Sequence, residues 1–155
     1  MSGPLSTENS VKAKTHNQPA FDEGEALEEL EPGQGVVRGN GGFEPAGADS
    51  PTKRVVREQR NPGGRGIEDD ESPLTQTYPA ESNVETLGFQ SHDQARLLVD
   101  DDGTETTVSE GDELAWGADG YLVTDGTDTV AVAANDEDVV IEADGGPVHV
   151  LVEFI

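Results

Sequence analysis

The chain has 155 residues, a formal net charge of -24 and no cysteine. The lack of cysteine excludes a disulfide framework and a thiolate metal site, and the negative charge opposes binding to nucleic acid. No apolar run approaches the roughly 18 residues of a membrane span, and the first residues lack the apolar segment of a signal peptide, so we expect no membrane partner.

The 33 acidic residues are spread over turns and strand flanks rather than gathered in one block. One block is typical of acidic tails and nucleic-acid mimics, whereas an even spread with almost no lysine is typical of proteins adapted to molar salt. At about 1 M salt the Debye length is about 3 Å, so the self-repulsion of such a chain is largely screened. We therefore expect this protein to originate from haloarchaea or their viruses.

Residues 1–30 are predicted to be a flexible N-terminal arm, because their first twenty residues are polar and show no periodicity. Within this arm, residues 22–31 could form one or two helical turns. Pro32 opposes helix at the residue before it, so any such element should be short.

Two strands are expected next, at residues 35–38 and 53–58, with a glycine-rich turn at 39–42 after the first. Residues 59–83 contain turn residues throughout and no period. We expect this long Pro/Gly-rich segment to be a loop excursion, and a loop of this length in a small domain is usually functional or disordered.

Short strands then follow at even spacing, separated by turns such as D-D-D-G and S-E-G-D. This pattern predicts an all-β fold, a small antiparallel β-barrel or sandwich, in which residues 31–155 form a single β-barrel domain. In the last strand, Val148, Val150, Val152 and Phe154 should form the core face. The strands are expected at residues 84–89, 95–99, 105–108, 114–116, 121–124, 129–133, 138–142 and 148–154.

The sequence lacks the residues that a metal site or a catalytic site would require. The acidic turn at 100–103 would be a calcium loop only if a carboxylate stood at position 98, which is Leu98. Ser109 lacks the G-x-S-x-G elbow of a nucleophilic serine. The histidines have no ligand spacing and are expected at a surface or interface: His16, His92 and His149. We therefore predict no enzyme activity, no metal, no cofactor and no small-molecule substrate.

Five of the nine basic residues fall within thirteen positions that contain one acidic residue, Glu58. From residue 66 onward the chain has 23 acidic residues and a single base, Arg96. Two interpretations remain open: pairing with the chain's own acidic strands, or contact with an acidic partner, which includes another copy of this protein. Arginine suits the second because its guanidinium binds carboxylates bidentately. The predicted contact residues are Lys53, Arg54, Arg57, Arg60 and Arg65.

Two groups of motifs resemble head decoration (capsid cement) proteins of tailed viruses. The first is V-S-E-G-D-E-L-A-W-G-A-D-G-Y-L-V, followed by T-V-A-V-A-A and the closing V-H-V-L-V-E-F-I. The second is E-P-G-Q-G-V-V-R-G-N-G-G-F-E-P, which is similar to the versions in viruses of haloarchaea. The resemblance covers roughly residues 30–155.

This resemblance implies a non-enzymatic protein on the outer surface of the virion capsid. It implies binding to the assembled major capsid protein, self-association as a homotrimer, and stabilisation of the shell by cross-linking of neighbouring subunits. The alternatives are a turret, spike-base or tail component of the same virion, or a cellular carbohydrate-binding or cupin-like β domain.

Overall fold

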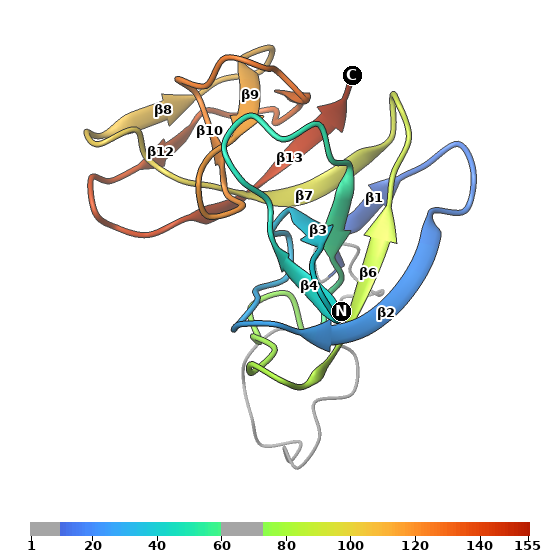
Figure 1. The fold of residues 1–155 in the computed structure, drawn as a ribbon. Coiled ribbons are helices and arrows are strands. Elements are labelled where there is room, and N and C mark those ends of the chain that lie inside the picture. The colour runs from blue at the N-terminus through green and yellow to red at the C-terminus, as the bar shows by residue number, and fades with distance from the viewer. Residues whose placement is uncertain (1–9, 60–72) are drawn as a thin grey trace, which may run out of the picture.

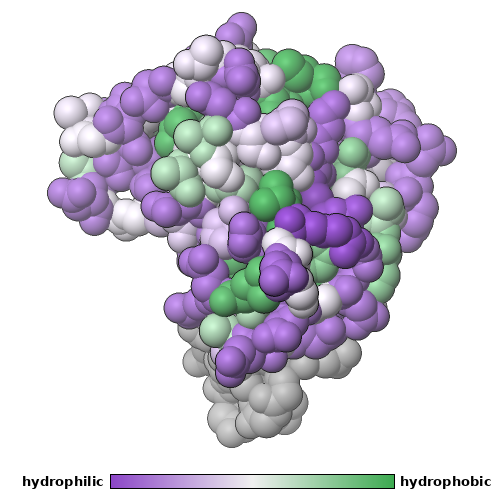
Figure 2. Space-filling model, viewed as in Figure 1, coloured by the Kyte–Doolittle hydropathy of each residue, from purple (hydrophilic) through white to green (hydrophobic). Residues whose placement is uncertain are grey.

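A computed structural model describes residues 10–59 and 73–155 of the chain. These residues form thirteen strands in three sheets and no helix, which confirms the predicted all-β fold (Figure 1). Hydrophilic residues cover most of the face seen in Figure 2, as expected for so acidic a chain.

The C-terminal half forms a closed five-stranded barrel. Its strands pair in the order β7–β10–β9–β11–β13, and β13 returns to pair with β7. All these pairings are antiparallel except β10 with β7. The strands are β7 (Gln94–Val99), β9 (Glu113–Trp116), β10 (Leu122–Val123), β11 (Ala131–Ala133) and β13 (Val148–Phe154). The alternation predicted for β13 is confirmed, because Val150, Val152 and Phe154 are buried and Val148 is partly buried against the same core.

A second sheet of five strands comes from the N-terminal half, in the order β3–β4–β2–β6–β5. An isolated bridge between Gly35 and Val55 links its two edges, so this sheet also curls on itself. The strands are β2 (Ala20–Ala26), β3 (Val36–Arg38), β4 (Gly42–Pro45), β5 (Arg54–Val56) and β6 (Asn83–Gly88).

A separate two-stranded ribbon is formed by β8 (Thr106–Val108) and β12 (Val139–Ile141). Val139 pairs with Val108, and Ile141 pairs with Thr106. Ile141 is buried in the barrel core, whereas the neighbouring Val140 is 53% exposed. The ribbon lies beside the barrel, on the far side of the molecule from β2 and β6 (Figure 1).

Trp116 joins the two halves of the molecule. Its side chain is fully buried in the larger of two hydrophobic cores, which fills the barrel and reaches Val55 of the second sheet. Its indole N–H donates to the Thr52 carbonyl at 2.8 Å. A Cβ on Gly35 would lie 2.8 Å from the indole ring, so only glycine allows this approach. A smaller core, which includes Leu30, Phe43 and Tyr78, fills the second sheet.

The prediction of a flexible N-terminal arm is wrong for residues 10–30. β1 (Lys12–Lys14) pairs with β7 of the barrel, and β2 pairs with β6 over six residues. The expected helical turns are also wrong, because A-F-D-E-G-E-A is a strand although acids and glycine disfavour strands. Pairing with β6 supplies hydrogen bonds that local propensity does not indicate. Residues 1–9, the rest of the expected arm, lie outside the described residues.

The predicted excursion at 59–83 is ordered where the structure describes it. Leu74 and Tyr78 are buried, and Tyr78 exchanges backbone hydrogen bonds with Leu30. The tyrosine hydroxyl donates to the Arg57 carbonyl at 3.0 Å. This end of the segment is therefore packed into the protein rather than structureless, with Tyr78 in the smaller core and Leu74 in the larger one.

Candidate interaction site

Among the described residues, the basic side chains lie on or next to β1 and the second sheet, apart from Arg96 on β7. Lys53 is the first of the predicted contact residues. Its ammonium donates to the Ser91 hydroxyl at 3.1 Å and to the Ile155 carbonyl at 2.7 Å. These bonds join the start of β5 to the end of β13. Lys53 thus contributes to the seam between the barrel and the second sheet.

Arg54 lies beside a second arginine over the ring of Phe43. The guanidinium carbons of Arg38 and Arg54 are 5.0 and 6.0 Å from the ring centroid. Arg54 also donates to the Thr86 hydroxyl at 3.0 Å, and Arg38 pairs with Asp22. Burial, together with the positive charge of Arg38, lowers the pKa of Arg54. The pair keeps two cations close together on an aromatic surface.

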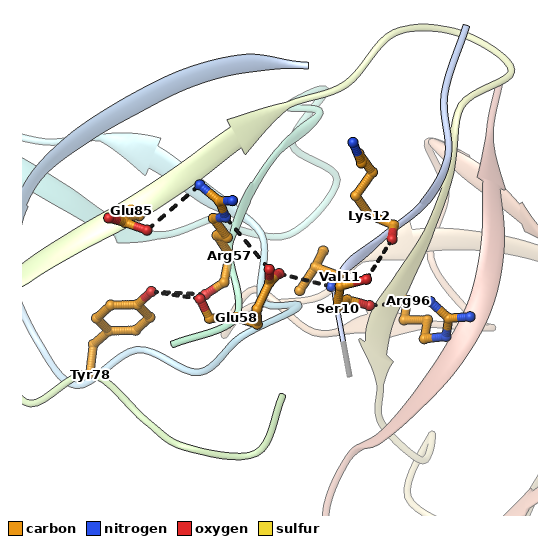
Figure 3. Close-up of polar contacts among 8 residues, drawn as sticks. All are labelled: Ser10, Val11, Lys12, Arg57, Glu58, Tyr78, Glu85 and Arg96. Atoms are coloured by element: carbon orange, nitrogen blue, oxygen red, sulfur yellow. Dashed lines mark hydrogen bonds and ion pairs between the residues drawn. The ribbon is translucent and has the colours of Figure 1, made fainter. Parts of the chain in front are cut away.

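Arg57 lies between two carboxylates (Figure 3). Its Nε is 3.6 Å from Glu58 Oε2, and its Nη1 is 3.7 Å from Glu85 Oε1. Glu58 also accepts the Val11 backbone N–H at 3.0 Å, so it connects the segment after β5 to β1. The guanidinium of Arg57 lies 5.8 Å from the ring centroid of Phe21.

These contacts border a groove of about 410 Å³ between β1 and the outer face of the second sheet. Phe21 and Leu87, which face each other across β2 and β6, supply its apolar surface. Lys12, Arg57 and Glu58 supply its charged side chains. Phe21 is 49% exposed, and in the described residues β4 pairs with β2 only at Glu25 and Ala26, so the edge of β2 beside Phe21 is open.

Lys12 differs from the other cations of this region. In the described ranges its ammonium forms no ion pair, and no dashed line reaches it in Figure 3. Arg57 is shared between Glu58 and Glu85, so Lys12 is the cation on the groove wall that has no carboxylate partner among the described residues. This is unusual in a chain of net charge -24.

Of the five predicted contact residues, the structure describes three. Arg57 pairs with acids of the chain itself, as the internal-pairing interpretation expects, whereas Lys53 and Arg54 bond to hydroxyl and carbonyl oxygens of the chain. Arg60 and Arg65 lie outside the described residues. A role of the cluster in contacting a partner stays a prediction.

The sequence did not reveal Lys12 and Phe21 as members of the groove. Both lie in the segment expected to be a flexible arm, 45 or fewer positions before the arginine they approach. The chain has only four phenylalanines, and one of them, Phe21, stands in an otherwise polar stretch. This was the signal that could have revealed a contact there.

His149 was expected at a surface or interface, and it lies at the internal seam between the two halves. Its Nε2 is 2.9 Å from the Pro32 carbonyl oxygen. Burial lowers the pKa of His149, and Arg96 acts in the same direction, while the Pro32 carbonyl and Glu31 oppose them. The neutral imidazole that donates to Pro32 is therefore favoured.

Within residues 10–59 and 73–155, no group of three or more His, Asp or Glu side chains is arranged to hold a metal ion. The same ranges contain no helix that is long and apolar enough to cross a membrane.

Comparison with known proteins identifies a fold. No family model matches the chain, and no curated protein matches it by sequence. A solved structure, the N base of head fiber gp8.5 of bacteriophage phi29, is similar with a TM-score of 0.51. The match covers 88% of this chain and 93% of the other, at 13% sequence identity. At this identity the likeness concerns the fold: the chain shares the architecture of a phage head fiber base.

Proposed function

We propose that this protein is a structural component of a virus particle and is attached to the outside of the head. The observation that carries the proposal is the fold likeness to a head fiber base over nearly the whole of both chains. The described residues add an all-β body of short strands with turns on its surface. Such a body suits a rigid surface module better than a catalyst.

The finer proposal is a decoration or cement role. Each copy would contact several subunits of the major capsid protein, as part of a homotrimer, and many weak contacts would add through their high effective concentration. The split in charge supports an orientation. No Lys or Arg follows Arg96, so the later barrel strands and their turns are acidic and suited to solvent, whereas most of the described bases lie on β1 or the second sheet, suited to a partner.

The acid excess supports a virus of haloarchaea. In molar salt the repulsion between neighbouring copies of net charge -24 is screened, so they can stand close together on a shell. The same crowding would be strongly opposed in dilute buffer.

A second candidate is the base of a fibre or turret at special positions of the head. The solved structure favours it directly, because that domain is described as the base of a head fiber. The two candidates share attachment to the head and differ in copy number and in whether the chain supports a further appendage.

Mass spectrometry and immunogold labelling of purified particles test the proposal. We expect the chain in the head fraction, and surface label on intact heads. A copy number close to that of the shell protein supports decoration, and one on the scale of the vertices supports the fibre base. Absence of the chain from purified particles would overturn both.

The contact role of the basic cluster is tested on the same particles. Heads stripped of the protein are incubated with wild type or with the Arg54→Glu/Arg57→Glu double variant at high salt. We expect wild type to bind and to raise the temperature at which DNA is released, and the variant to bind weakly. Equal binding by a folded variant would reject this role, with the circular dichroism spectrum as the check on folding.

A further inference from the structure

Two exposed apolar side chains have charged neighbours of opposite sign: the unpaired Lys12 beside one and two acids beside the other. Among the described residues the exposed large hydrophobic side chains are Phe21, Val140 and Ile155. Phe21 is in the groove beside Lys12 and Arg57. Val140 is on the outward face of β12, between the exposed acids Asp138 and Glu142, which share that face because side chains alternate along a strand.

The two sites cannot meet within one molecule, since β12 and β2 lie on opposite sides of it (Figure 1). They are also open in different ways. The groove is a hollow of about 410 Å³, whereas the ribbon of β8 and β12 projects beside the barrel (Figure 1). In the described residues no strand pairs with the outer edge of β12.

We propose that this protein associates with itself head to tail, through insertion of the β12 ribbon of one copy into the groove of the next. Val140 covers Phe21 and Leu87, and the carboxylates of Asp138 and Glu142 approach Lys12 and the outer edge of Arg57. Each copy uses two different patches, so the contact is heterologous and forms a closed ring or an open chain according to its rotation. The inference goes beyond the proposed function and applies to the isolated protein.

The strand edge itself explains why a side-chain contact is favoured over strand addition. Asp22 Oδ1 accepts the Glu23 backbone N–H at 2.8 Å, which occupies a donor on the open edge of β2. Glu23 is also on the same face as Phe21 and would repel the acids of an added β12 strand. The groove beyond Phe21, on the Lys12 side, avoids this repulsion.

The contact is small compared with interfaces of stable complexes, which bury about 1,200–2,000 Å². Association should therefore be weak and should require screening of the net charge. We expect wild type to be monomeric in dilute buffer and to form larger species at about 1 M salt, where the Debye length is about 3 Å. Sedimentation equilibrium over a wide range of protein concentration measures this.

The decisive experiment uses two variants that damage opposite halves of the contact. Val140→Asp removes the inserting side chain, and Phe21→Asp damages the groove; each should weaken self-association about tenfold or more. An equimolar mixture of the two should form a heterodimer, because one copy retains an intact groove and the other an intact ribbon. Ala118→Asp adds the same charge at an exposed apolar position and should associate like wild type.

A charge exchange provides an independent check, with the Trp116 fluorescence spectrum as the measure of folding. Lys12→Glu should weaken association, and the added substitution Glu142→Lys should restore much of it. A wild type that stays monomeric at high salt, or a mixture that forms no heterodimer, would overturn the proposal. Either result would leave the proposed location on the head untouched, because particle analysis tests that separately.

Discussion

The barrel and the second sheet of this small protein are both five-stranded and curled, but their strands differ in polarity. The barrel uses short apolar strands, such as V-H-V-L-V-E-F, and has acidic turns. The second sheet uses polar strands such as A-F-D-E-G-E-A, carries on its strands or next to them four of the seven described bases, and forms one side of the groove. We therefore predict that the barrel mainly supplies rigidity and that the second sheet makes the specific contacts.

The largest effect is expected where the two halves share a core. Trp116→Ala removes a fully buried indole and its bond to Thr52, and should cost about 3–5 kcal/mol of the free energy of unfolding. Chemical denaturation at high salt, followed by far-ultraviolet circular dichroism, measures this. If the halves are one cooperative unit, the variant unfolds in a single transition. Two separated transitions would show that each half folds alone.

A smaller loss is expected from a change confined to the second sheet. A Cβ at Gly42 would lie 2.2 Å from the Glu25 carbonyl oxygen, so Gly42→Ala must displace β4 from β2. We expect a loss of about 1–3 kcal/mol by thermal or chemical unfolding. Gly47→Ala is the matched control, because its Cβ would meet nothing within 4 Å. Equal stability of the two variants would contradict the close β2–β4 pairing.

The groove provides a third test, of arginine pairing. Arg57→Gln removes a guanidinium that is 21% exposed and lies near two carboxylates, and should cost about 1–2 kcal/mol. Arg38→Gln, at a side chain that is 62% exposed, should cost about 0–1 kcal/mol. Both are measured by urea unfolding in parallel. A larger loss at Arg38 would reverse the proposed ranking of the two sites.

The smallest effect is a pH dependence at the seam. Because burial lowers the pKa of His149 in the folded chain, the unfolded chain takes up a proton first as the pH falls. Its contribution to stability is thus full above the ordinary pKa of about 6.5 and is lost progressively below it. Unfolding titrations from about pH 7.5 to 5.5 should show this loss in wild type and a smaller one in His149→Gln. Equal slopes would assign the pH dependence to other groups.

The elements that the sequence identified share a visible local signal. Strands with alternating apolar residues, such as β7 and β13, were located closely, as was the glycine-rich turn before β4, where Gly41 has a positive φ of 96°. β1 and β2 were missed. Among the described residues, β4 pairs with only the last two residues of β2, so most of β2 is an open edge with polar side chains. Its strand state depends on pairing with residues about 60 positions away.

The sequence by itself determined the fold class, the strands of the barrel and the unequal distribution of charge, because alternation, turn residues and composition are local properties. Only the tertiary structure decided that residues 10–30 complete two sheets, that Trp116 joins the halves, and that Lys12, Phe21 and Arg57 line one groove. These features depend on contacts between distant segments. No local pattern encodes such contacts, because the backbone hydrogen bonds and the packing that fix them form only when the segments meet.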